Sequence, residues 1–541
     1  MKEGFRQSMA WLHTWSGLLV GWILFLVFAA GTASYFRDEI TLWMKPELHS
    51  ASQTHTAQAS QAGAIDLAQQ TLEQRAGNSR RWFINMPNAR NPALEASWIP
   101  APSKGADPKG ADPKARPKRR EFGSATLDPA TGKDLGTARA TRGGDFFFRL
   151  HFDLHYMSAI WGRWIVGACA MCMLVAILSG IVTHKRIFKD FFTFRPGKGQ
   201  RSWLDAHNVS AVLALPFHLM ITYTGLVTLM FMYLPSGVQA VYPDKSDAFY
   251  ADLNGGPSGN TRPSRELVPL APLGPMLAQA SRIWHGAPVG RITVSNPGHA
   301  NARVNLVLQE GRDMTQALPN LTFEGATGKL VAGTETGQGS GALQTRGVMY
   351  GLHVGRFADP LVRALFFLSG LAGCAMVATG LLMWAVKERP KHLKARKDGS
   401  IGFGLRLVDG LNVGGIAGLL LAMPVLFWAN RLLPVGGTGR PDLEIACFFT
   451  AWGIAAVAGL AWPARWMWRL QLALGGALFA LLPLLNAATG GAGLASSLAH
   501  GLWAIAGFDL VSLLLGVLLL YASLRLGPRA AVKPRLAGSA A

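Results

Sequence analysis

Long apolar segments recur along the chain and alternate with polar or charged stretches. Eight of them contain the roughly 20 residues that an α-helix needs to cross a hydrocarbon core about 30 Å thick. They cover residues 10–35, 157–183, 205–233, 361–386, 406–429, 443–462, 468–487 and 499–524. The pattern therefore predicts an all-α polytopic membrane protein with eight transmembrane helices.

Charge gives these helices an orientation. Half of the 541 residues are hydrophobic and 15% are charged, yet the net charge is +21. The basic residues gather in short connections, at 2–6, 185–201, 387–397, 465–469 and 525–535, which share one side of the membrane if the helices alternate. Short connections rich in Lys and Arg face the cytoplasm. We therefore expect both termini in the cytoplasm, with the lipid bilayer as partner and no role in nucleic-acid binding.

Two long segments fall on the opposite, periplasmic side. In each, helical spacing precedes strand-like alternation: "AIDLAQQTLEQRAG" precedes "RRWFINMP", and "PLGPMLAQASRIWHG" precedes "GRITVSN". The first segment also contains the linker-like stretch "KGADPKGADPKARPKRR". We expect helices at 1–36, 157–184, 203–233 and 359–387, outer α+β modules at 37–156 and 234–358, and a four-helix extension at 405–525.

The first 390 residues read as two copies of one unit. "HTWSGLL" matches "HNVSAVL", and an "ATGK" turn occurs once in each outer module. The offsets are 194 for His13 and His207, 198 for His155 and His353, and 200 for Gly180 and Gly380. Similar offsets in unchanged order predict a two-copy parallel repeat about an axis along the membrane normal.

Histidines at equivalent positions suggest a cofactor. The repeat axis would bring His13 toward His207 near the inner leaflet, and His155 toward His353 near the outer leaflet. Two neutral imidazoles from different helices are the axial ligands of a six-coordinate haem iron. The alternatives are histidines bonded to backbone carbonyls, or zinc, for which neither depth offers further Asp, Glu or Cys donors.

The other histidines and arginines near these depths have open roles. His218, near the predicted midplane, is a candidate haem ligand or a hydrogen-bond donor to a propionate. His151 is interpreted as an interfacial residue. Arg163, Arg356 and Arg363 near the outer rim are candidates for binding propionates or an anionic chelate, or for anchoring at the interface.

The sequence resembles a known family. "LHTWSGLLVGWILFLVFAAG", "LHYMSAIWGRWIVG" and "WLDAHNVSAVLALPFHLMITYTGL" are similar to motifs of the PepSY-associated transmembrane proteins, which include PiuB-like iron-regulated proteins and ferrisiderophore reductases. The resemblance covers residues 5–390. It implies a bacterial inner membrane location, periplasmic PepSY modules, and haem b, here two groups, held by His13, His155, His207 and His353, with His218 matching part of the family.

These observations favour an oxidoreductase that moves electrons to the periplasmic face and reduces a ferric siderophore or another ferric chelate. No Rossmann, P-loop or flavin pattern occurs, so the electron donor is expected to be a cytoplasmic protein or a quinol. The alternatives are a substrate transporter and a membrane-anchored PepSY regulatory or binding protein without redox activity. The role of residues 405–525 stays open between packing, oligomer contact and quinol access.

Overall fold

The structure is a computed structural model. It describes the chain apart from residues 1–2, 50–60, 89, 92, 101–122, 130–133, 137, 184–187, 189–192, 244–247, 250–261, 312, 316–317, 334–340, 396–399 and 527–541. The linker-like stretch at 104–120 and the first "ATGK" turn at 130–133 lie outside the described residues.

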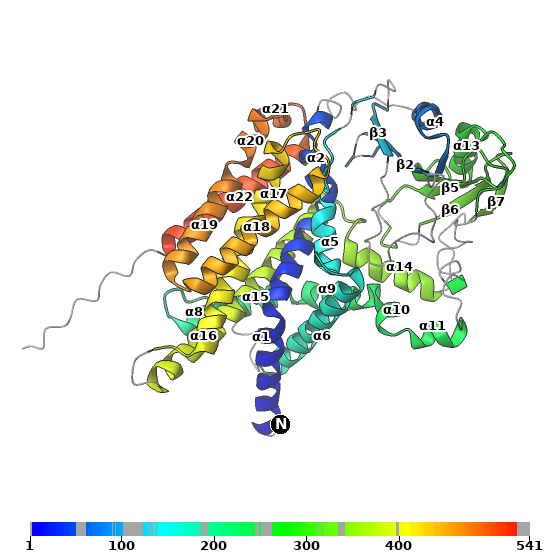
Figure 1. Ribbon diagram of the computed structural model, residues 1–541. Helices are drawn as coiled ribbons and strands as arrows, with labels where there is room; N and C mark the ends of the chain where they lie inside the picture. The colour runs from blue at the N-terminus through cyan, green and yellow to red at the C-terminus, as the bar shows by residue number, and fades with distance from the viewer. Residues whose placement is uncertain are drawn as a thin grey trace, which may run out of the picture.

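Long apolar helices form the larger part of the molecule (Figure 1). Six units are long and apolar enough to cross a membrane, and two bent helix pairs raise the number to as many as eight. The six are α1 (Glu3–Ser34), α6 (Ala159–Thr183), α15 (Pro360–Ala395), α18 (Arg440–Ala461), α22 (Trp503–Arg525), and the unit of α16 (Phe403–Asn412), a π-helical turn (Val413–Ala417) and α17 (Gly418–Leu432). These helices imply a lipid bilayer as the environment of the chain.

The two bent pairs break where proline enters the helix. α8 (Gln200–Leu213) and α9 (Leu215–Thr228) meet at 67°, and α19 (Arg465–Ala480) and α20 (Leu482–Ala488) meet at 41°. Pro216 and Pro483 are each the second residue of the later helix. Proline lacks the amide hydrogen and its ring obstructs the preceding turn, so the earlier helix ends there.

Strands from both outer segments form one sheet. Its order is β3-β2-β1-β4-β5-β6-β7, and the central β1–β4 pair joins the two segments in antiparallel register. The strands are β1 (Ser79–Asn85), β2 (Leu94–Pro100), β3 (Gly123–Leu127), β4 (Val289–Ser295), β5 (Arg303–Leu308), β6 (Asn320–Glu324) and β7 (Leu330–Gly333). The expected modules are therefore halves of a single seven-stranded sheet.

Two helices cover one face of this sheet. α4 (Gln61–Ala76) and α13 (Leu273–Ile283) lie beside the sheet (Figure 1). Their apolar residues pack onto it, and the two halves share one hydrophobic core. The sheet and these helices lie beyond one end of the helical bundle. We call that end of the bundle outer and the opposite end inner.

Short helices connect the sheet to the bundle. They are α2 (Arg37–Trp43), a 3-10 turn (Pro46–Leu48), α5 (Asp145–Asp153), α10 (Met230–Tyr233), α11 (Ser236–Val241) and α14 (Gly341–Val354). A further short helix, α21 (Leu494–Ala499), lies between α20 and α22. α5 precedes α6 and α14 precedes α15. The sequence patterns did not predict α5 or α14.

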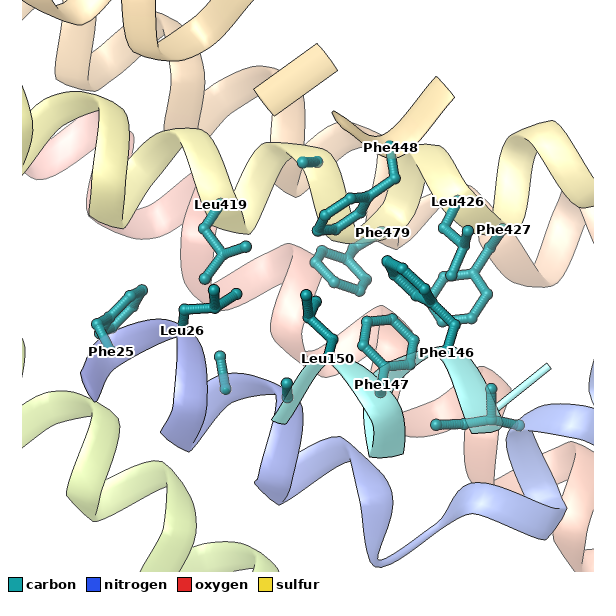
Figure 2. Packing of buried hydrophobic residues seen from close by; sticks show 14 of the residues in the cluster. Phe25, Leu26, Phe146, Phe147, Leu150, Leu419, Leu426, Phe427, Phe448 and Phe479 are labelled. Carbon is teal, nitrogen blue, oxygen red and sulfur yellow. The ribbon is translucent and has the colours of Figure 1, made fainter. Parts of the chain in front are cut away.

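α1 lies between the two groups of helices. It packs against α6 and α15 on one side, and Trp22 donates a hydrogen bond to Asn412 of α16 on the other, over 3.0 Å. Figure 2 shows side chains of α1 and α5 meeting those of the C-terminal helices in one apolar cluster. The C-terminal extension is thus part of the same core.

Candidate cofactor-binding sites

The structure brings His13 and His207 together, as the repeat predicts. His13 lies on α1 and His207 on α8, and their ring centroids are 6.1 Å apart. The two rings are inclined at 72°. They face each other across a cavity of about 320 Å³, which we call the inner cavity.

A carbonyl and a glycine hold each of these rings. His13 Nδ1 is 2.8 Å from the carbonyl oxygen of Ala176, and His207 Nδ1 is 2.8 Å from that of Met376. A carbonyl only accepts, so each Nδ1 carries the proton and each Nε2 keeps its lone pair. Gly180 and Gly380 lie one turn beyond those carbonyls, and a Cβ there would come within 3.1–3.2 Å of the rings.

A second pair of histidines lies toward the outer end. His151 of α5 and His353 of α14 have ring centroids 5.9 Å apart and are inclined at 35°. Both line a cavity of about 300 Å³, which we call the outer cavity. Burial, together with the neighbouring His151, lowers the pKa of His353 to about 3, so this ring is neutral at physiological pH.

The predicted partnership of His155 with His353 is wrong. His155 follows α5 and stacks on Phe449 of α18, with ring centroids 5.2 Å apart, so its ring points toward the C-terminal helices. His151, interpreted from sequence as interfacial, takes the place opposite His353.

The outer pair is held in the same way as the inner one. His151 Nδ1 is 2.7 Å from the carbonyl oxygen of Val27. His353 interacts with the backbone of Ile221, and its Nδ1 lies 3.1 Å from the hydroxyl oxygen of Thr224. Both of these backbone groups precede a glycine by four residues. A Cβ on Gly31 would lie 2.6 Å from the His151 ring, and one on Gly225 would lie 2.9 Å from the His353 ring. Each of the four histidines thus packs on a glycine and bonds to the residue one turn before it.

The ring spacing suits a single metal ion between each pair. A metal–imidazole bond of about 2 Å, added to roughly 1 Å from Nε2 to the ring centre, separates opposed ring centroids by about 6 Å. Within the described residues, no group of three or more His, Cys, Asp or Glu side chains could hold a metal ion. The chemistry of this donor set therefore fits an ion whose remaining ligands come with a cofactor.

The walls of both cavities are mostly apolar, with polar groups toward the two ends of the bundle. The inner cavity includes Lys387 and Gln200, and the outer cavity includes Arg163 and Tyr350. A flat apolar macrocycle with acidic substituents at one edge would meet complementary surfaces in each cavity.

One layer of side chains separates the cavities. Leu24 of α1 and Met173 of α6 line both of them. His218 is fully buried and lines the inner cavity. Its ring centroid is 5.9 Å from that of Phe28, which lines the outer cavity. The structure thus places His218 between the two histidine pairs.

The hydrogen bonding of His218 is incomplete. Its Nε2 lies 3.3 Å from the carbonyl oxygen of Ser369. Its Nδ1 lies near the Ala211 backbone without the geometry of a hydrogen bond. Unlike the four other histidines, this ring has no opposed imidazole partner among the described residues at a comparable distance.

The three rim arginines expected to bind anions are each paired with a carboxylate. Arg163 bonds to Asp153 over 2.7 Å, while Arg356 and Arg363 pair with Glu310 and Glu39. Only Arg163 of the three is among the residues that line the outer cavity. The outer rim is therefore charge-compensated, with Arg163 placed to meet a group inside the cavity.

The signal that sequence reasoning missed lies in "FFFRLHFDLH". It contains His151 and His155, one helical turn apart, and the matching motif of the second copy contains only His353. Matching "LHYMSAIWGR" of the first copy with "LHVGRFADPLVR" of the second pairs His155, and not His151, with His353. The pair Gly31 and Gly225 was the better guide, because each of these glycines contacts a ring of the outer pair.

The fold and these cavities define a polytopic membrane protein with two buried histidine pairs, one toward each end of a helical bundle. Residues 10–387 match the family described as the PepSY-associated TM region. This is more than half of the chain, which therefore belongs to that family. An uncharacterized protein of Pseudomonas aeruginosa is 26% identical over 342 residues, 60% of this chain and 81% of the relative.

Proposed function

We propose that this chain is a di-haem b-type cytochrome of the bacterial inner membrane that passes electrons to the periplasmic face and reduces ferric siderophore iron there. The observation that carries the proposal is the spacing of the two pairs, 6.1 Å for His13 and His207 and 5.9 Å for His151 and His353. Each bound haem would supply a reversible one-electron couple between ferric and ferrous iron. No Cys-x-x-Cys-His sequence occurs, so attachment would be non-covalent.

The chain's own residues prepare these sites. Nδ1 of His13, His207 and His151 donates to a backbone oxygen, which fixes the tautomer and directs Nε2 into the cavity, an arrangement common for ligating histidines. Nδ1 of His353 meets the hydroxyl of Thr224 instead. The glycines let the rings approach the neighbouring helices, and the apolar walls exclude water. The same construction at all four histidines supports a two-copy origin for the first four membrane-crossing units.

The placement of one pair toward each end of the bundle supports an electron path between the inner and the outer side. A quinol or a reduced cytoplasmic protein would give one electron at a time at the inner side, and a ferric chelate would accept one at the outer side. Reduction of Fe(III) to Fe(II) weakens the binding of iron by an oxygen-rich chelator, because hard oxygen donors favour the harder Fe(III) ion. The basic connections at 185–201 and 387–397 support a cytoplasmic position for the inner end.

A transporter is the second candidate, favoured by one observation. The 67° break between α8 and α9 beside the inner cavity resembles the discontinuous helices that line transport sites. A transporter would move the chelate across the bilayer, whereas the proposed reductase changes only its oxidation state.

Reconstituted vesicles distinguish the two. Protein reduced with dithionite, freed of excess reductant and then given a ferric siderophore outside should show reoxidised haem and Fe(II) appearing outside, with no chelate in the lumen. Vesicles with His13→Ala protein are the control and should lose reduction that depends on an internal donor. Accumulation of intact ferric chelate in the lumen without a spectral change would contradict the reductase proposal.

A further inference from the structure

The C-terminal helices, α16 to α22, lie outside the family match, and their contacts assign them a role. They meet the chain where the first outer segment leaves the bundle, at residues 43–49, and where it returns, at 139–147. We propose that this C-terminal unit is a brace that holds α5 where His151 faces His353. The inference rests on the proposed function for the identity of the group between these rings.

Aromatic side chains of α5 anchor it to the brace. The ring centroids of Phe146 and Phe448 are 5.0 Å apart, and those of Phe147 and Phe427 are 5.9 Å apart. Figure 2 shows Phe146 and Phe147 of α5 lying against Phe448 and Phe427 of the C-terminal helices. His151 lies one turn after Phe147, so a shift of this face would move the His151 ring away from the outer cavity.

The segment just before α5 is held by buried charges. Thr141 donates a 2.6 Å hydrogen bond to Glu444, and Arg440 donates a 2.8 Å hydrogen bond to the carbonyl of Ala140. Arg440 and Glu444 pair with each other and are each only 1% exposed. Arg139 donates to a carbonyl oxygen of α17 over 2.9 Å. Losing one partner of such a pair leaves an uncompensated buried charge, so this contact fixes the return of the chain.

Residues 43–49, where the first outer segment leaves the bundle, also bond to the C-terminal unit. The indole of Trp43 donates a 2.8 Å hydrogen bond to Asp509, while Arg431 donates to the Trp43 carbonyl. The amide of Ala492 donates to Nδ1 of His49 over 3.0 Å. α2, which ends at Trp43, also contacts the start of α5, because the Gly144 amide donates a 2.9 Å hydrogen bond to the hydroxyl oxygen of Thr41. Both ends of the outer segment therefore meet the same unit.

α5 needs such support because it is short. It contains nine residues, and isolated helices of this length are marginal in water. Outside the brace, Arg37 of α2 pairs with Asp145 at the start of α5, His151 bonds to the Val27 carbonyl of α1, and Asp153 pairs with Arg163 of α6 at its end. The brace contributes the apolar contacts of Phe146 and Phe147 on the remaining face. By contrast, His13 lies within the long helix α1, which the brace contacts at Trp22, nine residues further along. The brace should therefore control the outer site and spare the inner one.

Phe448→Ala tests the proposal, with Phe448→Leu as the conservative variant and Met467→Ala as the control. Met467 is also buried, but it lies at the start of α19, next to the end of α18 that is remote from α5. Two readouts are combined in the full-length protein: the low-spin haem signals, assigned with His151→Ala and His13→Ala, and deuterium exchange of the α5 amides.

We expect Phe448→Ala to reduce the outer signal by about half or more and to speed exchange in α5, with the inner signal intact. Phe448→Leu should restore most of the outer signal, and Met467→Ala should change neither readout. Unchanged α5 exchange in Phe448→Ala, or equal loss of both signals, would overturn the brace. If the wild-type protein carries no haem, the proposed function fails, and α5 exchange alone decides the brace.

Discussion

At the residue scale, one small unit occurs four times: a histidine, a glycine beneath its ring, and a hydrogen-bond acceptor one turn before that glycine. The glycine is needed for space, since a Cβ would meet the ring at 2.6–3.2 Å. Histidine pairing from sequence succeeded at His13 and His207, where the offset matched that of the surrounding helix. It failed at His155, because the first copy has two Leu-His pairs, at His151 and His155, and the second copy has only one, at His353.

The glycine unit predicts a steric effect on one site. Gly31→Val should push the His151 ring aside and lower bound haem from about two per protein to about one. Gly453→Val in α18 is the control, because a Cβ there meets nothing within 4 Å. Haem content and the low-spin spectrum measure the effect, and an unchanged outer signal in Gly31→Val would refute the packing argument.

The corrected pairing predicts different outcomes for neighbouring histidines. His151→Ala should remove one low-spin site, because it deletes a ligand, whereas His155→Ala should keep both. Spectra of the two purified variants decide. Loss of the outer site in His155→Ala alone would restore the pairing first expected from the sequence.

His218 is predicted to adjust a site without ligating it. His218→Phe keeps an aromatic ring beside Phe28 and removes the unbonded Nδ1, so both low-spin signals should remain while the inner midpoint potential changes. A potentiometric titration followed optically gives the shift. Disappearance of a low-spin signal would instead identify His218 as a ligand.

At the element scale, the long helices were predictable and the short ones were not. Eight apolar segments matched six long units and two bent pairs, since about 20 apolar residues leave few alternatives in a membrane. α5 and α14 lie in stretches that were assigned to the ends of the outer modules, just before α6 and α15, and their positions depend on tertiary contacts. The β1–β4 pair joins residues more than 200 positions apart, so local alternation could not reveal it.

The connection between α2 and the C-terminal helices predicts a pH dependence. Burial, then the positive charge of Arg431, lowers the pKa of His49 to about 4, so the folded protein keeps this ring neutral. Its unfolded pKa is about 6.5, so the unfolded state binds the proton first as the pH falls. The stability from the neutral ring is full above pH 6.5 and is lost toward pH 4, by roughly 2 kcal/mol between pH 7 and 5.

Thermal unfolding in detergent at pH 7 and pH 5 measures this effect. The decrease in stability should be smaller in His49→Gln, which keeps hydrogen-bonding groups but cannot titrate. His500→Gln, on an exposed side chain, should behave as wild type. An equal decrease in wild type and His49→Gln would exclude His49 as the source.

At the scale of the whole molecule, α1 runs past both histidine pairs, from the inner to the outer end of the bundle. α1 carries His13 near one end and Gly31, which contacts His151, 18 residues later, or ~27 Å along the axis. Cofactors filling both cavities would be separated mainly by the layer of Leu24 and Met173. The seven-stranded sheet lies beyond the outer end, where an acceptor would dock, and the C-terminal helices hold the connections between bundle and sheet.

The most direct test of this account is the haem content and low-spin spectrum of the purified protein from haem-replete cells, oxidised and dithionite-reduced. We predict about two non-covalent haems per chain, both low-spin with bis-imidazole ligation. One should be lost in His13→Ala and the other in His353→Ala. A colourless wild-type protein, or two haems that survive in both variants, would contradict the central claim.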